Sequence, residues 1–208
     1  RVSGGHVGTF DNRGTLVRST SGGAFTLEGM TFENSGSVDI QSVSLAMVAG
    51  VNPFDFNWSD GALSGTGSLD FIGGARLNIT GSGTRVLDGL SLSLNDLTLG
   101  MGSLEVRGGT FNASGNTTIS DGASLSLTGG TLETGTSAIL DILGVFAMSG
   151  GQLLGDGVVN VSNTGQFNYS STGPDTLDFD INSAGSVYVE NGVLNLSGNL
   201  VQNAGLTT

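Results

Sequence analysis

The sequence repeats itself as GSLEV at residues 102–106, GASLSL at 122–127, GVFAM at 144–148, GQFNY at 165–169 and GSVYV at 185–189. The leading glycines recur at a nearly constant interval of about 21 residues. A second glycine series follows the same rhythm at Gly109, Gly130, Gly151 and Gly192. A fixed period of this length is typical of a solenoid, in which each circuit of the chain, here called a lap, packs on the next.

Within each repeat, short runs of alternating apolar and polar residues predict half-buried β-strands. Residues 144–164 contain three such runs, at 145–148, 152–154 and 158–161, separated by glycine-rich turns. The repeats lack runs of strong helix formers at a spacing of 3.6 residues. We therefore expect an all-β parallel β-helix with about 20–22 residues per lap and about ten laps, roughly 45 to 50 Å long at a lap spacing of about 4.8 Å.

Stacked laps place equivalent residues in ladders along the solenoid axis. The repeat glycines are expected at turns with positive φ, which residues with a side chain tolerate poorly. Two buried ladders are predicted, one of Leu104, Leu125, Phe146, Phe167 and Val187, and the other of Phe111, Leu132, Leu153 and Leu194.

The chain is acidic, and its few cations lie in the first half. Its 208 residues include six arginines and no lysine, the last arginine is Arg107, and the net charge is −12. Nucleic acid is therefore not an expected partner, because phosphate binding needs clustered cations. Membrane insertion is not expected either, because no apolar run approaches the length of a span. Cysteine is absent, which excludes disulfides and thiolate metal sites.

Two stretches break the rhythm, near residues 41–66 and 87–101, and they indicate irregular laps or insertions. Leucines alternate well within the second stretch, so it is expected to form strands in a short lap. We predict a single solenoid domain over residues 1–208, belonging to a longer exported protein or polymer.

The first irregular stretch carries the clearest candidate binding residues. It holds Pro53, which cannot donate in a central strand ladder, together with Phe54, Phe56 and the only tryptophan, Trp58. If these rings project from an insertion, they form an aromatic platform suited to sugar rings or to a protein partner. The alternative is that they fill the core of a wide lap.

Asp178 and Asp180 are the one plausible carboxylate pair for glycoside chemistry. On a single strand they would project from one face about 7 Å apart, within the range that glycosidases use. Tyr169 or Tyr188 could line a groove beside them. The same aspartates are weak candidates for Ca²⁺, which takes oxygen ligands, although the glycine-rich nonapeptide of calcium-binding β-rolls is absent. Solvated aspartates and no cofactor are the simpler interpretation.

The repeats also resemble a known group of proteins. Residues 185–199, GSVYVENGVLNLSGN, and residues 122–132, GASLSLTGGTL, are similar to the degenerate repeats of bacterial autotransporter passengers and filamentous-haemagglutinin-like surface proteins. This resemblance implies a right-handed parallel β-helix displayed outside a bacterial cell as an adhesin, a stalk or a filament. It transfers no site residues, because the repeat residues are structural.

These observations predict an extracellular or cell-surface structural or adhesive module without catalysis. Its expected partners are other copies of itself, end to end or laterally, and host or matrix glycans or proteins. The alternative is a β-helix enzyme or binding protein that acts on polysaccharides.

Overall fold

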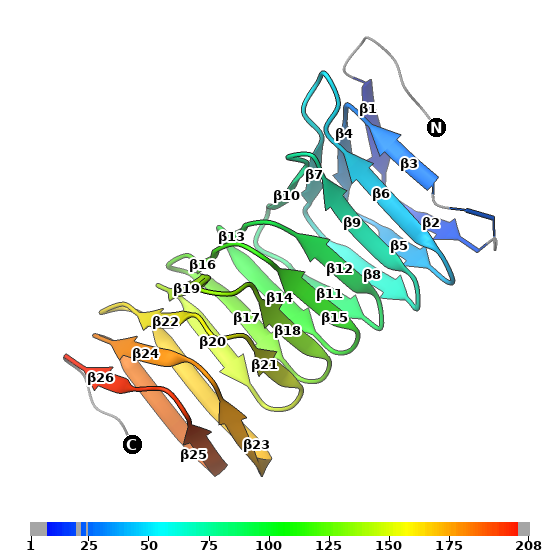
Figure 1. The fold of residues 1–208 in the computed structure, drawn as a ribbon. Helices are drawn as coiled ribbons and strands as arrows, with labels where there is room; N and C mark the ends of the chain where they lie inside the picture. The colour runs from blue at the N-terminus through cyan, green and yellow to red at the C-terminus, as the bar shows by residue number, and fades with distance from the viewer. Residues whose placement is uncertain (1–7, 20–21, 24, 204–208) are drawn as a thin grey trace.

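The structure, a computed structural model, describes residues 8–19, 22–23 and 25–203. Within these residues the chain contains β-strands and no helix, and it forms a parallel β-solenoid of about nine laps with roughly 21 residues per lap. Figure 1 shows the laps stacked along one axis, with the first strands at one end of the rod and the last strands at the other. The predicted all-β solenoid is confirmed.

Three parallel sheets form the three sides of the rod. The ten-stranded sheet contains β1 (Gly8–Asn12), β4 (Met30–Asn34), β7 (Asp55–Trp58), β10 (Arg76–Ile79), β13 (Leu97–Leu99), β16 (Thr117–Ile119), β19 (Ile139–Ile142), β22 (Val158–Val161), β24 (Asp180–Ser183) and β26 (Leu200–Gln202). The nine-stranded sheet contains β2 (Thr15–Arg18), β5 (Ser37–Ile40), β8 (Gly61–Gly65), β11 (Thr84–Asp88), β14 (Gly102–Val106), β17 (Ala123–Leu127), β20 (Val145–Met148), β23 (Gln166–Leu177) and β25 (Ser186–Leu196). The seven-stranded sheet contains β3 (Phe25–Glu28), β6 (Ser44–Val48), β9 (Ser68–Ile72), β12 (Ser91–Leu94), β15 (Thr110–Ala113), β18 (Thr131–Thr134) and β21 (Gln152–Leu154).

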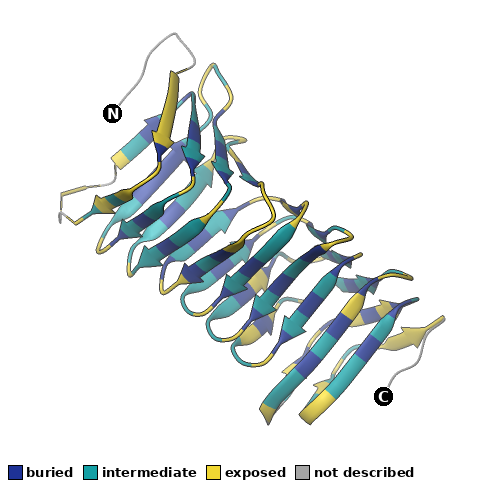
Figure 2. Ribbon diagram, turned by 180° about the vertical axis from the view of Figure 1, so that it is seen from behind, coloured by how far each residue is buried: buried dark blue, intermediate teal, exposed yellow. Residues whose placement is uncertain are grey.

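The alternation in the sequence places every second strand residue in the core. In Figure 2 buried and less buried positions alternate along most strands. The three strands expected between residues 144 and 164 are present as β20, β21 and β22, with the predicted bounds. The first predicted ladder is also confirmed, because each of its five residues pairs with the next one in parallel register.

The second predicted ladder is correct as far as Leu153 and wrong at Leu194. Phe111 pairs with Leu132, and Leu132 pairs with Leu153. The seven-stranded sheet then ends at β21, because β23 and β25 continue as long strands beyond the nine-stranded side. Leu194 therefore pairs with Asp175 and is only partly buried.

Positive φ is confirmed for the second glycine series and is only partly correct for the first. Gly109, Gly130, Gly151 and Gly192 have φ between 67° and 79°. In the first series Gly144 is among those with ordinary φ, and its position excludes a side chain for another reason. A Cβ there would collide with the carbonyl oxygens of Ala123 and Ser120 in the preceding lap. Close approach of two laps, rather than backbone conformation, requires glycine at this site.

The two irregular stretches mark a change in lap length. Val38 pairs with Leu63, and Leu63 pairs with Leu87, so both of these laps are longer than the average of roughly 21 residues. Leu87 then pairs with Val106, which makes the next lap shorter than the average. The wide laps thus give way to narrow ones between β8 and β14, and the solenoid core must adjust there.

Candidate functional site

The three aromatic residues of the first irregular stretch lie in the core, so they form no exposed platform. Phe54, Phe56 and Trp58 have no solvent-exposed surface. Phe56 stacks on Phe32 with ring centroids 4.7 Å apart and planes 7° apart. The Trp58 indole donates a hydrogen bond of 2.8 Å to the backbone oxygen of Asp60. The condition for an exposed platform, that the rings project from an insertion, is not met. Phe54 just before β7 and the alternating Phe56 and Trp58 of β7 point inward and fill the wide laps, which is the alternative given above.

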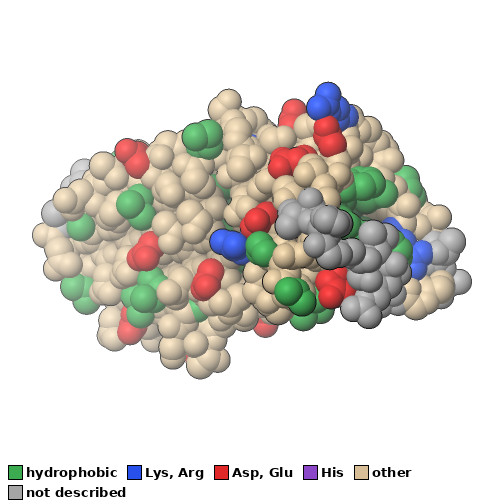
Figure 3. All heavy atoms as spheres, turned by 90° about the horizontal axis from the view of Figure 1, so that it is seen from above, with side chains coloured by type: hydrophobic (Ala, Val, Ile, Leu, Met, Phe, Trp, Pro, Cys, Tyr) green, Lys and Arg blue, Asp and Glu red, His purple; other side chains and the backbone are tan. Residues whose placement is uncertain are grey.

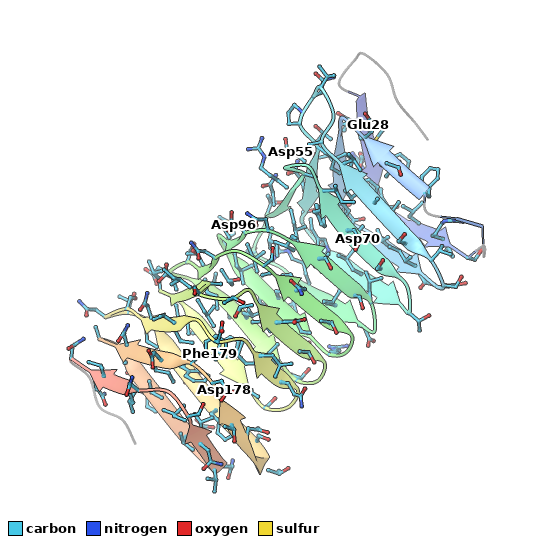
Figure 4. The ribbon with its side chains drawn as sticks, in the orientation of Figure 1. Glu28, Asp55, Asp70, Asp96, Asp178 and Phe179 are labelled. Carbon is cyan, nitrogen blue, oxygen red and sulfur yellow. The ribbon has the colours of Figure 1, made fainter. Side chains whose placement is uncertain are left out.

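The pair Asp178 and Asp180 is exposed, but it is not held on one strand. The chain turns a corner after β23, where Asp178 and Phe179 lie (Figure 4), and Asp180 begins β24. Phe179 between them is fully buried. The Asp178 carboxylate accepts a hydrogen bond from the Ser197 hydroxyl. The two carboxylates are thus separated by a bend, which the uninterrupted alternation of the sequence did not reveal.

Asp180 is engaged with the following lap. Its Oδ1 atom accepts hydrogen bonds from the backbone and side-chain nitrogens of Asn199, at 2.8 and 3.1 Å. In the described part of the chain, no three carboxylate or imidazole groups come together in a way that could hold a metal ion. The structure therefore adds nothing to the weak calcium candidates Asp178 and Asp180.

Tyr169 faces the core rather than a groove. Its side chain is fully buried, and its hydroxyl donates to Asp175 Oδ2 at 2.8 Å. The backbone oxygen of Val193 lies 3.3 Å from the same hydroxyl. Burial, together with the neighbouring Asp175 carboxylate, raises the pKa of Tyr169 above its ordinary value. Tyr188 lies on the outer face of β25 and is half-buried.

A row of polar side chains runs along the outer face of the ten-stranded sheet from β1 to β24, and its position on β26 is taken by Val201. Successive laps place one polar side chain after another in register, and we call this row the polar column. Its members are Asp11, Glu33, Asn57 and Asn78 in the first half, and Thr98, Thr118, Asp141, Asn160 and Asn182 in the second. Hydrogen bonds join neighbours from Asn57 to Glu33 (2.7 Å), Asn78 to Asn57 (2.9 Å), Asn160 to Asp141 (2.8 Å) and Asn182 to Asn160 (3.3 Å).

Two shallow hollows lie along this column. One, of about 290 Å³, is lined by Asn78 and Thr98 together with Asp96 and Arg76. The other, of about 220 Å³, is lined by Asp141, Asn160 and Asn182 among others. Figure 4 shows Asp55 and Asp96 along the same side of the rod. Amide, hydroxyl and carboxylate groups offer both donors and acceptors here, so this face can form hydrogen bonds with a polar ligand.

The sequence contains a signal for the column that the repeat analysis missed. Asn57 precedes Asn78, and Asn160 precedes Asn182, by an interval that matches one lap. Figure 3 shows that, on the face seen there, the carboxylates are scattered along the rod rather than gathered in one cluster. The number of asparagines in the sequence does not show whether they form such a row, because unrelated surface asparagines would give the same number.

A second feature missed from the sequence is a buried cation. Arg85 occupies an inward position of β11 with no exposed surface, between Gly61 and Leu104 of the adjacent laps. Its guanidinium donates to backbone oxygens of three successive laps, including Ser59 at 3.1 Å and Gly83 at 2.8 Å. Burial lowers the pKa of Arg85, and the Asp60 charge partly opposes this.

Comparisons with known proteins add no family. No protein-family model matches the chain, and the searches of curated proteins and of solved structures give no significant match. The resemblance to autotransporter and haemagglutinin-like repeats therefore stays at the level of the β-solenoid fold. In the described part of the chain no helix has the length and apolar character needed to cross a membrane.

Proposed function

We propose that this chain is a rigid structural or adhesive module that acts outside the cell, on a bacterial surface, without catalysing a reaction. The observation that carries the proposal is the unbroken ten-stranded sheet, which continues from β1 to β26 with parallel pairing at every step. Nine laps at about 4.8 Å each give a rod of roughly 40 to 45 Å. A rod of this kind is suited to holding attached parts at a fixed distance.

The distribution of ionisable groups supports a non-catalytic role. Catalytic sites gather groups with perturbed pKa values in a cleft. Here the two groups buried most completely, Arg85 and Tyr169, point into the core and bind backbone or neighbouring side-chain atoms. The exposed pair Asp178 and Asp180 is occupied by hydrogen bonds to the next lap. These groups stabilise laps, and none of them faces a shared cleft.

Adhesion, if it occurs through a lateral face, is best served by the polar column. Its side chains recur at the lap spacing, so an extended partner lying along the rod meets the same chemistry in several successive laps. This repetition favours weak contacts that add up along a chain. The same face also suits the alternative function, in which the chain binds polysaccharides without cleaving them.

Two measurements test the proposal. Small-angle scattering of the purified chain should give a narrow rod of the length stated above, and a compact sphere would contradict a spacer role. A panel of neutral and acidic glycans and matrix proteins then tests adhesion through the column. Binding should be lost in the variant Asn160→Ala/Asn182→Ala and retained in Ser124→Ala/Ser126→Ala, which changes the outer face of β17 on another side.

The polysaccharide-cleaving alternative has a separate test. Wild-type chain and the variant Asp178→Asn/Asp180→Asn are incubated with the same glycans, and the reducing ends that appear are measured. We expect no release by either protein. Release that the double variant abolishes would replace the structural role by an enzymatic one.

A further inference from the structure

The strand ladder of the ten-stranded sheet is weakest between β10 and β13 (Figure 1). β10 pairs with β7 at all four of its residues, but it pairs with β13 only where Ile79 meets Leu99. Every other neighbouring pair of strands that the structure describes in this sheet shares at least three register positions. Residues 76–78 therefore have no ladder partner in β13, and the sheet is open there.

This opening coincides with the hollow of about 290 Å³ described above. Part of its lining is apolar, because Leu77 is buried and Ala75 packs against the core from a partly buried position. Gly74 adds no side chain, and a Cβ there would meet open space. The volume is close to the lower limit of small-ligand sites, about 300 Å³, so the hollow suits one small ring rather than a larger molecule.

Polar side chains around the hollow keep unused hydrogen-bonding capacity. Asn78 Nδ2 donates to Asn57 Oδ1 at 2.9 Å, and no described residue donates to Asn78 Oδ1. Thr98 is exposed, and its hydroxyl has no partner among the described residues. Arg76 Nε lies 3.2 Å from Asp55 Oδ1, which leaves the two terminal nitrogens of Arg76 available. The hollow thus offers both donors and acceptors to a ligand.

The charges at the hollow nearly cancel. Arg76 is matched by Asp55, and the lining has one further carboxylate, Asp96, on the same side of the rod (Figure 4). Asp96 already accepts hydrogen bonds from the Asn116 backbone nitrogen and from Asn95 Nδ2, both at 2.8 Å. An anion would be repelled by Asp96, and a cation would be repelled by Arg76. A neutral molecule that carries hydroxyl groups matches this site.

We propose that the hollow binds one ring of a neutral saccharide. Thr98, Asn78 and Arg76 form hydrogen bonds with the ring hydroxyls, and Ala75 and Leu77 contact its C–H groups. A sugar ring carries polar groups at its edge and apolar groups on its faces, which is the combination that this lining provides. The inference rests on the proposed function, because it names the ligand class and one defined contact point for the polar column.

A short probe separates this hollow from the rest of the column. Asn160 lies four strands beyond Asn78 in the ten-stranded sheet, about 19 Å away at about 4.8 Å per strand. The full chain, labelled with ¹⁵N, is titrated with four neutral disaccharides: maltose, cellobiose, lactose and N,N′-diacetylchitobiose. At least one of them should shift the backbone amides of residues 74–78 and 95–98 and leave those of residues 158–162 in place. Digalacturonate, which is anionic, should bind at least about tenfold more weakly than that disaccharide.

Two substitutions at exposed positions then test the contacts. Thr98→Val and Arg76→Met should each weaken binding of the disaccharide about tenfold, because each removes a hydrogen-bonding group from the ring. Thr131→Val is the control for the first, since Thr131 lies on the outer face of β18 in the seven-stranded sheet. Arg107→Met is the control for the second, since Arg107 is an exposed arginine paired with a carboxylate elsewhere on the rod. Both controls should bind like the wild-type chain.

The outcomes distinguish this inference from the proposed function. Amide shifts centred on another part of the column, equal affinity for digalacturonate, or unchanged binding by Thr98→Val and Arg76→Met would overturn the hollow as the site and leave an adhesive column standing. Failure of all four neutral disaccharides to bind also overturns the inference, while a chain that scatters as a rod keeps its spacer role. A compact sphere would overturn the proposed function as well.

Discussion

Replacing Arg85 by methionine should lower the free energy of unfolding by about 2 to 3 kcal/mol. Arg85 lies where the wide laps give way to narrow ones, and its inward neighbour on the preceding lap is Gly61, which supplies no side chain. The guanidinium fills this corner and binds backbone oxygens of the laps before, within and after its own. Besides Ser59 and Gly83, its acceptors are the backbone oxygens of Trp58, Thr80, Gly81 and Ser103.

The magnitude follows from the acceptors that have no other described backbone partner in this corner. The oxygens of Trp58 and Gly83 also accept backbone hydrogen bonds, from Thr80 and Ser103 respectively, so they keep one partner. The oxygens of Ser59, Thr80 and Gly81 lose the guanidinium, at about 1 to 1.5 kcal/mol each. Removing a buried charge returns part of that cost, because the guanidinium no longer has to be desolvated on folding. The net loss is then about 2 to 3 kcal/mol.

Chemical denaturation, followed by circular dichroism, measures the loss. Arg85→Lys keeps the charge but offers one compact ammonium in place of the planar fork, so its stability should fall between wild type and Arg85→Met. Arg107→Met is the control, because Arg107 is an exposed residue paired with Glu105 at 2.8 Å, and such surface pairs are worth less than about 1 kcal/mol.

Two outcomes would refute the reasoning. If Arg85→Met is as stable as wild type, the backbone oxygens find other partners and the corner does not depend on the cation. If Arg85→Lys equals wild type, charge alone suffices and the fork geometry is irrelevant. Hydrogen exchange distinguishes a local effect of the substitution from a global one. If the effect is local, only the backbone amides of the loop of residues 80–83 should exchange faster than in the wild-type chain.

Three further predictions follow from single positions. Thr117→Val should raise the free energy of unfolding by about 1 kcal/mol in thermal or chemical melts, because the Thr117 hydroxyl is buried in an apolar column without a hydrogen-bond partner; a destabilised variant would contradict this. Gly144→Ala should cost about 2 to 3 kcal/mol, whereas Gly100→Ala, with open space around it, should be nearly neutral; equal costs in the two melts would argue against close approach of laps. Tyr169 has a raised pKa in the folded chain, so the stability it contributes is present below its unfolded pKa of about 10 and is lost as the pH rises through the higher folded value. In a Tyr188→Phe background, ultraviolet titration should place its ionisation above pH 10, and a value at or below 10 would contradict the burial argument.

The sequence predicted the period, the three strands of the lap at 144–164 and the first ladder, because these depend only on alternation and spacing. The same alternation also indicates whether the aromatic residues point into the core or out of it. Phe54, Phe56 and Trp58 occupy alternate positions, so they share one face, and a strand of large rings on one face packs inward unless something else covers the core. The wide laps need that volume. Pro53 suggested an exposed insertion, but it lies just before the strand rather than within it.

Bends between strands are the part that alternation cannot predict. Asp178, Phe179 and Asp180 are exposed, buried and exposed in turn, as they would be on one straight strand, although the chain bends between the two aspartates. The alternation is therefore the same with the bend or without it. Arg85 was equally hidden, since an arginine in an alternating run is normally assigned to the outer face. Its guanidinium fits inside because Gly81 and Gly102 have no side chains: a Cβ at Gly102, in the following lap, would lie 2.7 Å from Arg85 Nη1, and one at Gly81 would lie 3.3 Å from Nη2. Such a dependence between laps is visible only once the register is known.

The separation of inner and outer columns also indicates where function can reside in this fold. Inner positions are constrained by packing in every lap, so they carry little information about partners. Outer positions are free to vary, yet Asn57, Asn78, Asn160 and Asn182 recur at the lap length and bond to members of the same column. Because those bonds leave part of each amide and carboxylate available, the column stabilises the sheet and still presents hydrogen-bonding groups along one side. A partner that binds several laps of this column must be extended along the rod. This geometric requirement favours polymeric glycans or long protein strands over small molecules.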